Sequence, residues 1–325
     1  MENSNIIPKK KIIRKKKEDK TELQKPFLKW VGGKTQIIDN ILKYFPKNME
    51  NYHEIFLGGG SVLLALLSLR KKNEITVNNK IYAYDLNPAL INTYNQIKNN
   101  HQIVINHIKK IIDEFSLIKK NTDGQKGKPE NLTESNYKNT REHYYYWTRD
   151  LYNKSVKNTP LSAAYFIFLN KTGYKGLYRE GPNGFNIPYG QKDKKKIPGI
   201  IVEDDVKKIS VLIQDVDFIC LDFTDSLKKV GEKDFVYLDP PYAPESKKSF
   251  VGYTKDGFSL ETHKKLFSEI KIINNKNAKF LLSNAKVDLV TKNFEDFNSE
   301  EIIARRAVHQ KNPETKTTEV LIYNL

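Results

Sequence analysis

Short apolar runs recur along the chain, and their spacing predicts an α/β sheet. Runs of strand length occupy 53–57 (HEIFL) and 81–85 (IYAYD), and five more lie at 217–221, 234–238, 279–283, 301–304 and 319–323. Glycines separate the first run from residues 61–72 (SVLLALLSLRKK), which have the length and apolarity of a buried helix. Strand, glycine loop, helix and strand in this order form a βαβ unit, which implies parallel strands with right-handed crossovers.

Between the two groups of strands the pattern changes to that of helices. Apolar residues at helical spacing are Val104, Ile108, Ile111, Ile112 and Phe115, and a polar loop and a tyrosine-rich stretch follow them. Pro88 marks a helix start, because proline is tolerated in the first turn. The pattern predicts an α/β domain made of 26–95 and 205–325, interrupted by a mainly helical insert at 96–204.

The first 25 residues are predicted to form a disordered tail outside this domain. They carry nine lysines and arginines against four acids and have no apolar stripe, and like charges in a polar segment favour disorder. Such a tail could contact phosphates, serve as a nuclear address, or be a solvated extension.

Composition adds a partner class to this picture. The formal charge of the 325 residues is +16 at pH 7, which favours a polyanionic partner. Nucleic acid is preferred to a membrane, because no apolar run reaches transmembrane length. The amino terminus is polar and lysine-rich, so no signal peptide is expected. With Cys220 as the single cysteine and no histidine spacing such as HExxH, neither a disulfide framework nor a metal site is expected.

The glycine loop at 56–61 (FLGGGS) predicts a first binding pocket. Glycine lets the backbone approach a ligand, and the helix that follows favours a carboxylate or phosphate at its N-terminus. Asp85 ends the next predicted strand, where an acid can bind ribose hydroxyls. The spacing differs from GxGxxG, so NAD is not favoured. A nucleoside-type ligand is predicted, and a merely tight strand–helix turn is the alternative.

A second glycine pair, at 32–33, resembles the end of a phosphate loop but does not complete one. The motif GxxxxGK[ST] would need its first glycine at position 28, which is Leu28, and no clear strand precedes it. A nucleoside triphosphatase is therefore rejected.

Asp239, in the stretch LDPPYAP (238–244), predicts a second pocket at the carboxyl end of a strand. Pro240 and Pro241 fix the backbone and donate no hydrogen bond, but their carbonyls remain acceptors. Together with the flat ring of Tyr242, this acceptor-only set suits a planar group that carries an NH₂. The alternative is a strand that ends in a Pro-Pro turn, with Asp239 as a local cap.

The expected chemistry follows from the weak nucleophilicity of an aromatic amine. If Asp239 and the Pro240 carbonyl each accept one amine hydrogen, the nitrogen moves toward tetrahedral geometry and its lone pair becomes available. These hydrogen bonds strengthen as positive charge develops on nitrogen, which is the differential stabilisation that catalysis requires. Tyr242 can stack on the base, a contact worth roughly 1–3 kcal/mol.

Eight stretches in order resemble the Dam-type DNA adenine methyltransferase family, from about residue 26 to the C-terminus. They are FLKWVGGK (27–34), EIFLGGGS (54–61), AYDLN (83–87), LNKTGYKGLYR (169–179), FNIPYG (185–190), LDF (221–223), DPPY (239–242) and LLSNA (281–285). The resemblance implies a Rossmann-like S-adenosylmethionine-dependent methyltransferase fold, with 26–95 and 205–325 as catalytic domain and 96–204 as an inserted, mainly helical target recognition domain.

The family further implies methyl transfer from S-adenosylmethionine to the 6-amino group of adenine in duplex DNA. By resemblance, Asp239, Pro240 and Tyr242 are the catalytic residues that hold the adenine. The cofactor site would be lined by Trp30, Gly32, Lys34, Phe56, Gly58, Gly60, Ser61, Asp85, Asp222, Phe223 and Asp239.

An adenine within a duplex must be flipped out to reach such a pocket, and the loop at 171–179 has suitable aromatics and cations. Tyr174 could wedge into the stack, and Arg179 could bind guanine in bidentate fashion. Resemblance adds a guanine contact for Lys29 and a GATC-like site, although Lys175 and 181–182 depart from the common pattern. The DNA-binding set is Lys29, Lys171, Tyr174, Leu177, Arg179 and Pro188. The run 192–196 could contact phosphates or be a solvated loop.

Asp239 also narrows the chemistry, because related cytosine amino methyltransferases usually have Ser there and glutamine methyltransferases have Asn. Carbon-5 cytosine methylation needs a nucleophilic cysteine, and Cys220 is predicted to lie in a buried strand.

A silent DNA-binding protein and an RNA adenine methyltransferase are the rival hypotheses. Left open are a cognate restriction endonuclease, oligomeric state, and location: bacterial cytoplasm and nucleoid, or virion, viral factory or nucleus.

Overall fold

The computed structural model describes residues 23–118, 132–190, 203–243, 258–305 and 316–325. Most of the predicted tail, at 1–22, and the lysine run at 192–196 lie outside the described residues.

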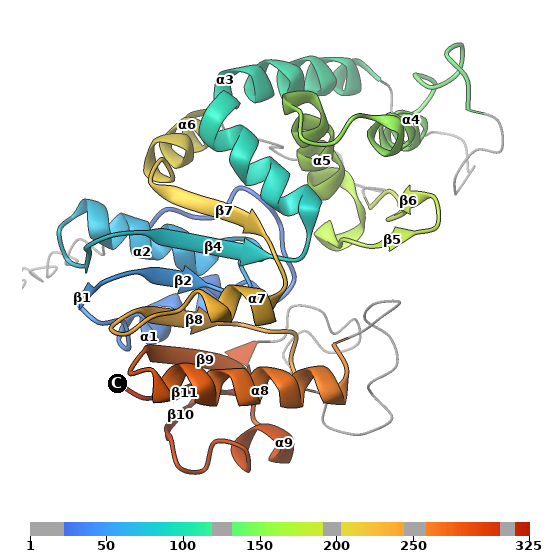
Figure 1. The fold of residues 1–325 in the computed structure, drawn as a ribbon. Helices are drawn as coiled ribbons and strands as arrows, with labels where there is room; N and C mark the ends of the chain where they lie inside the picture. The colour runs from blue at the N-terminus through green and yellow to red at the C-terminus, as the bar shows by residue number, and fades with distance from the viewer. Residues whose placement is uncertain (1–22, 119–131, 191–202, 244–257, 306–315) are drawn as a thin grey trace, which may run out of the picture.

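A seven-stranded sheet forms the centre of the molecule, in the order β10-β11-β9-β8-β2-β4-β7 (Figure 1). Neighbours among β2, β4, β7, β8 and β9 are parallel, whereas β11 runs antiparallel to both β9 and β10. The strands are β2 (Tyr52–Glu54), β4 (Ile81–Asp85), β7 (Val216–Cys220), β8 (Phe235–Leu238), β9 (Lys279–Ala285), β10 (Asn298–Arg305) and β11 (Lys316–Tyr323). All seven runs predicted as strands therefore contribute to one mixed, mostly parallel sheet, although β2 ends at Glu54 where the glycine loop begins.

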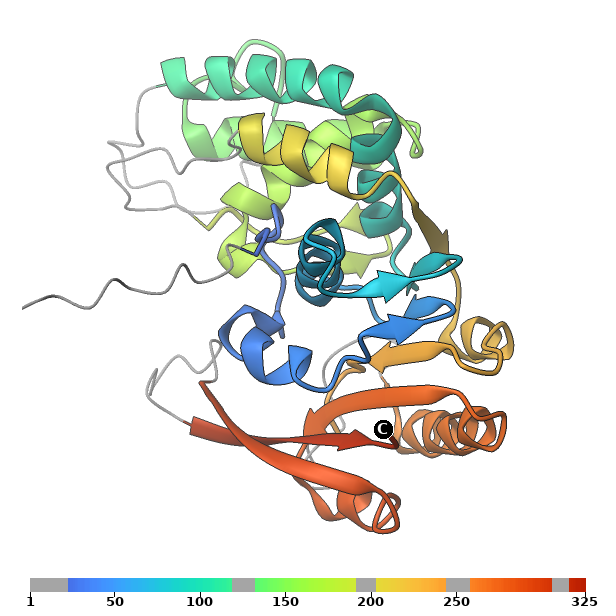
Figure 2. The same ribbon diagram turned by 90° about the vertical axis from the view of Figure 1, so that its left-hand side faces the viewer.

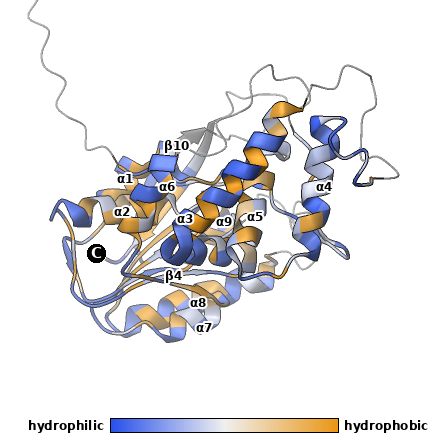
Figure 3. Cartoon of the chain, turned by 90° about the horizontal axis from the view of Figure 1, so that it is seen from above, coloured by the Kyte–Doolittle hydropathy of each residue, from blue (hydrophilic) through white to orange (hydrophobic). Residues whose placement is uncertain are grey.

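Helices cover both faces of the sheet. On one face lie α1 (Ile38–Leu42) and α2 (Ser61–Lys71), and on the other lie α7 (Phe223–Lys228) and α8 (Leu260–Asn275) (Figures 2 and 3). Side chains of β8 alternate between the two cores: Phe235 and Tyr237 join the first, and Val236 and Leu238 the second. Both faces are buried, which explains why the strand is a continuous apolar run.

The segment after β4 is mainly helical in its described parts, as predicted. Helix α3 (Pro88–Leu117) begins at the proline, and the Asn87 side chain caps it by accepting hydrogen bonds from two backbone N–H groups. The other helices of this region are α4 (Arg141–Lys154), α5 (Pro160–Thr172), the short η2 (Tyr174–Gly176) and α6 (Glu203–Leu212). A small hairpin of β5 (Glu180–Gly181) and β6 (Gly184–Phe185) follows η2.

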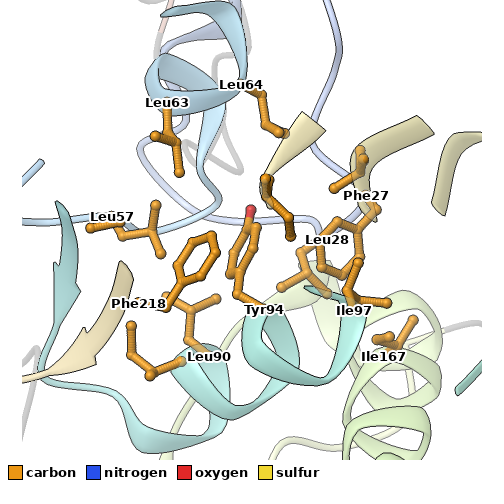
Figure 4. Close-up of a cluster of buried hydrophobic side chains, with 14 of the residues drawn as sticks. Phe27, Leu28, Leu57, Leu63, Leu64, Leu90, Tyr94, Ile97, Ile167 and Phe218 are labelled. Carbon is orange, nitrogen blue, oxygen red and sulfur yellow. The ribbon is translucent and has the colours of Figure 1, made fainter. Parts of the chain in front are cut away.

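This helical region shares a core with the sheet. In Figure 4, Tyr94 and Ile97 of α3 pack among Phe218 of β7, Leu64 of α2 and Ile167 of α5. The boundary predicted at residue 96 lies within α3, and the first non-helical residue of that helix is Asn100, with φ −137°. The division into a catalytic and a recognition domain stays a prediction.

Four short elements complete the described fold. They are η1 (Lys34–Gln36), β1 (Asn48–Met49), β3 (Thr76–Val77) and α9 (Asp288–Thr291). Among the described residues, no helix is long and apolar enough to span a membrane, and no group of three or more His, Cys, Asp or Glu side chains is placed to hold a metal ion.

The prediction that Cys220 lies buried in a strand is wrong. Cys220 is the last residue of β7, an edge strand that pairs only with β4, and it is exposed. Its Sγ lies 3.7 Å from the Leu86 carbonyl oxygen. Burial therefore gives no ground to exclude Cys220 as a nucleophile.

Candidate active site

The candidate site lies where the chain reverses its direction across the sheet. From β2 the chain adds β4 and β7 on one side, and it later returns to add β8 and β9 on the other. In open α/β sheets, ligands bind outside the carboxyl ends of the strands at such a switch point. The glycine loop follows β2, Asp85 ends β4 and Asp239 follows β8, so the fold brings the two predicted pockets to one edge.

Asp85 is bound to the glycine loop itself. Its Oδ2 accepts a hydrogen bond from the Gly58 N–H at 2.9 Å, and its Oδ1 accepts one from the Asn87 N–H at 2.9 Å. Burial raises the pKa of Asp85, and these backbone hydrogen bonds act in the opposite direction. The carboxylate that was predicted to bind ribose is thus already oriented by the loop it faces.

Bulky neighbours explain why the loop consists of glycines. A Cβ at Gly59 would lie 2.8 Å from Trp30 Cβ, and one at Gly60 would lie 2.3 Å from the Tyr94 hydroxyl. Gly58 and Gly60 also have positive φ, at +50° and +70°, which disfavours other residues. Tyr94 donates a hydrogen bond to the Gly59 carbonyl at 2.8 Å. The sequence predicted a role for the glycines and, by resemblance, for Trp30. It gave no indication of Tyr94, because a tyrosine on the apolar face of a helix has no distinctive pattern.

Lys34 connects the two pockets. Its backbone N–H donates to Ser61 Oγ at 3.1 Å, at the start of α2. Its Nζ lies 2.8 Å from Asp239 Oδ2 and donates to the Gly32 carbonyl at 2.9 Å. The amine also lies 4.8 Å from the centre of the Tyr242 ring. This cation is almost completely buried, so its attraction to the carboxylate is screened little by solvent.

Asp239 is a carboxylate in a poorly solvated position, with a side chain 17% exposed. Burial raises its pKa to about 6, with Lys34 acting against that rise and Glu319 adding to it. Among the described residues, nothing donates a hydrogen bond to its Oδ1 or to the carbonyl of Pro240. Two acceptors at the end of β8 therefore have no donor within the part of the chain that the structure describes, and their use in holding an amine stays a prediction.

Two residues that the sequence reasoning missed hold the turn after β8. His263 Nε2 lies 3.1 Å from the Pro241 carbonyl oxygen, and its Nδ1 lies 2.9 Å from that of Ser259. The Ala243 N–H donates to Asn284 Oδ1 at 3.0 Å. Asn284 belongs to a motif that supported the resemblance, whereas a lone histidine in α8 gave no signal.

An aromatic cluster lies beside the glycine loop. Phe56, Phe223 and Phe258 pack with ring centres 5.8–6.0 Å apart. Asp222, which comes just before Phe223, caps α7 by accepting a hydrogen bond from the Thr224 N–H at 2.9 Å. The structure therefore places Phe56 and Phe223 together, and it gives Asp222 a helix-capping role alongside its predicted one.

The predicted DNA-binding residues are also brought together, across a long sequence distance. Asn170 accepts a hydrogen bond from the Lys29 N–H at 2.9 Å and donates one to the Lys29 carbonyl at 2.8 Å. Lys29 Nζ donates to the Lys171 carbonyl at 3.0 Å, and burial with the charge of Lys29 lowers the pKa of Lys171 to about 8. Asn170 was quoted only as part of a motif, yet it joins the amino-terminal segment to the loop.

One backbone hydrogen bond and one hydrogen bond between side chains connect the rest of the loop to residues 186–188. The Tyr174 N–H donates to the Pro188 carbonyl at 2.9 Å, and Arg179 Nε donates to Asn186 Oδ1 at 2.6 Å. Leu177 is half-buried and Arg179 exposed. Lys175 has φ +54°, a conformation that is uncommon outside glycine.

This geometry agrees with a family match over most of the chain. Residues 30–308 match the model of the D12 class N6 adenine-specific DNA methyltransferases. The chain belongs to this family. The enzyme is therefore an adenine-specific DNA methyltransferase, as the motifs predicted.

Individual relatives of the methyltransferase are similar over nearly their whole length. The type II methyltransferase M.MjaIII of Methanocaldococcus jannaschii is 36% identical, over 92% of this chain and 99% of that protein. The DNA adenine methylase of Haemophilus influenzae is 29% identical, over 94% of this chain and 95% of the relative. That of Escherichia coli K12 is 27% identical, over 91% and 93%.

Proposed function

We propose that this methyltransferase transfers a methyl group from S-adenosylmethionine to the 6-amino group of an adenine flipped out of duplex DNA, within a GATC-like site. The observation that carries the proposal is a pair of unused acceptors at the carboxyl end of β8. Lys34 engages one oxygen of Asp239, while the other oxygen and the Pro240 carbonyl have no donor among the described residues.

The two acceptors match the two hydrogens of an adenine amine. When both are accepted, the nitrogen lone pair is withdrawn from the ring and becomes nucleophilic. Positive charge then develops on nitrogen during transfer, and the carboxylate stabilises that charge more than it stabilises the neutral amine. Tyr242, whose ring lies 4.8 Å from Lys34 Nζ, would stack on the base with its other face. Asp239 must be ionised for this role, so the pH dependence of transfer reports its pKa.

The residues at the glycine loop fit S-adenosylmethionine, which would supply a methyl group on a positively charged sulfur. Each carboxylate oxygen of Asp85 accepts one backbone hydrogen bond and keeps a lone pair that could accept from a ribose hydroxyl. The rings of Phe56 and Phe223 offer an apolar surface to an adenine. Trp30, Gly32, Ser61 and Asp222 complete the proposed cofactor site.

The loop after α5 is proposed to read the DNA. Flipping a base costs a few kcal/mol, and a side chain that fills the gap lowers that cost. In this proposal Tyr174 enters the stack, supported by its position in the loop that also contains Lys171, Leu177 and Arg179 and that contacts Lys29 and Pro188. The helical segment 96–204 is thereby proposed as the target recognition domain, and exposed Arg179 as the side chain that binds a guanine edge.

Methyl transfer to plasmid DNA tests the proposal, with the modified positions mapped by sequencing. N6-methyladenine in GATC-like sites is expected, and Asp239→Ala should abolish transfer while leaving DNA binding largely intact. Modification of another base, or full activity of Asp239→Ala, would contradict the proposed chemistry. Duplex DNA and RNA offered in competition separate this function from RNA methylation, and thermal stabilisation by S-adenosylmethionine separates it from silent DNA binding.

A further inference from the structure

A group of buried polar atoms without partners lies beside Asp239. The hydroxyl oxygens of Tyr237, Tyr242 and Ser283 and Oε2 of Glu319 are buried and make no hydrogen bond of ordinary geometry, although Tyr242 lies within interaction range of both Glu319 and Ser283. A buried polar group without a partner costs about 1–3 kcal/mol, so four in one place require an explanation. Three hydroxyl groups are donors, whereas the carboxylate is an acceptor with several lone pairs.

Sheet register places these atoms on the same face, at the end of the sheet where Asp239 lies. Tyr237 pairs with Leu281, and Ser283 lies two residues further along β9. Glu319 of β11 pairs with Ala285, two residues beyond Ser283. Residues two apart in a strand point to the same side. Glu319 lies on β11, two strands away from β8, and its side chain is on the same face of the sheet as Tyr237. The turn that contains Tyr242 follows β8 at this end of the sheet.

The charge of Glu319 acts on both residues that hold the base in the proposed function. Burial raises the pKa of Asp239, and Glu319 adds to that rise. Burial likewise raises the pKa of Tyr242, to which the carboxylates of Asp239 and Glu319 contribute. The remaining titratable neighbours are Lys34, which opposes the rise at Asp239, and Glu54, whose own pKa burial raises to about 8. Near pH 6 Glu54 is neutral, and Glu319 is the carboxylate that acts on both Asp239 and Tyr242.

We propose that Glu319 is a positioning residue for methyl transfer, whose carboxylate accepts the hydroxyl hydrogens of Tyr242 and Ser283 and so fixes the Tyr242 ring beside Asp239. This role of Glu319 rests on the proposed function, in which the Tyr242 ring stacks on the adenine. Glu319 also adds a negative charge near Asp239. That charge would help to stabilise the positive charge that develops on the adenine nitrogen as it accepts the methyl group. Lys34 contacts Asp239 and Tyr242 from elsewhere in the chain, so ring, cation and carboxylate form one unit.

The test compares Glu319→Gln with wild type in single-turnover methyl transfer between pH 5 and 8. Glutamine keeps the shape but loses the charge. We expect transfer at pH 8 to fall by up to about a hundredfold, the loss that a misplacement of about 1 Å at the reacting groups can cause. The acid limb of the profile should also move to lower pH, because the group that helps to raise the pKa of Asp239 is neutral. Glu300→Gln is the matched control, an exposed glutamate on β10.

Tyr242→Phe provides a second measurement if Glu319→Gln folds poorly. It removes a donor to Glu319 and leaves the carboxylate charged, so the acid limb should move to higher pH, opposite to Glu319→Gln. Acid limbs that stay in place in both variants would overturn the role of Glu319. Wild-type protein that leaves adenine in duplex DNA unmethylated would instead overturn the proposed function, and the role of Glu319 with it.

Discussion

Lys34 Nζ lies 2.8 Å from Asp239 Oδ2, and the Lys34 side chain is only 4% exposed. Lys34 is the group that opposes the effect of burial on the pKa of Asp239, which is about 6. A cation this close favours the ionised carboxylate. It also holds one oxygen in place and leaves the other without a donor among the described residues.

Lys34→Met should therefore raise the pKa of Asp239 further. At neutral pH a larger fraction of the carboxyl is then protonated and cannot accept an amine hydrogen, so transfer falls, and it recovers as the pH increases. The measurement is the methyl-transfer rate between pH 6 and 9, with Lys47→Met, an exposed lysine, as control. An acid limb that stays in place, or that moves to lower pH, would contradict this electrostatic role.

Gly60→Ala should destabilise the protein because two costs coincide. Its φ is +70°, and the added Cβ would lie 2.3 Å from the Tyr94 hydroxyl. A loss of about 1–3 kcal/mol in the free energy of unfolding is expected, measured by urea denaturation. Gly32→Ala is the matched control, since Gly32 has φ +81° but a Cβ added there would meet no atom within 4 Å, so it isolates the backbone cost. Equal losses in the two variants would rule out the contact with Tyr94.

Asn170→Ala should weaken DNA binding more than it weakens cofactor binding. Asn170 makes hydrogen bonds to both the N–H and the carbonyl of Lys29, and a longer one to the Gly176 carbonyl. Without them the amino-terminal segment is no longer fixed to the loop. We expect the KM for DNA to rise about tenfold, as for the loss of about 1.4 kcal/mol, with little change in S-adenosylmethionine affinity measured by calorimetry. An unchanged KM for DNA would show that the hydrogen bonds between Asn170 and Lys29 have no part in DNA recognition.

Asp234 should make stability depend on pH in the acid range. Burial raises its pKa, but hydrogen bonds from His53, the Gly231 N–H and Asn51 outweigh this and hold the pKa below its usual value. A carboxyl with a depressed folded-state pKa stabilises the fold above its unfolded pKa of about 3.9, and the contribution disappears as the pH falls through the folded value. Asp234→Asn should thus lose stability at pH 7 and show a flatter decline below pH 4. A decline as steep as that of wild type would contradict the assignment.

The sheet, and the positions of the glycine loop and Asp239 at one edge of it, were predictable because each has a local signal. A strand followed by glycines, or by Asp-Pro-Pro-Tyr, can be recognised without knowing what lies across the fold. The positions of Tyr94, Asn170 and Glu319 could not be predicted, because each acts on a segment far away in sequence. Cys220 was misjudged because an apolar run does not reveal whether its strand will be central or at the edge.

The segment from Lys29 to Lys34 connects the loop that is proposed to contact DNA directly to Asp239, the residue proposed to hold the adenine amine. Its first residue is fixed to the loop proposed to contact the duplex, Trp30 packs on the glycine loop, and its last residue orients Asp239. A duplex seated out of register would thus displace the very cation on which methyl acceptance depends. In the proposed function, fidelity and speed depend on the same short piece of backbone, so a variant selected for relaxed sequence preference should also be a slower enzyme.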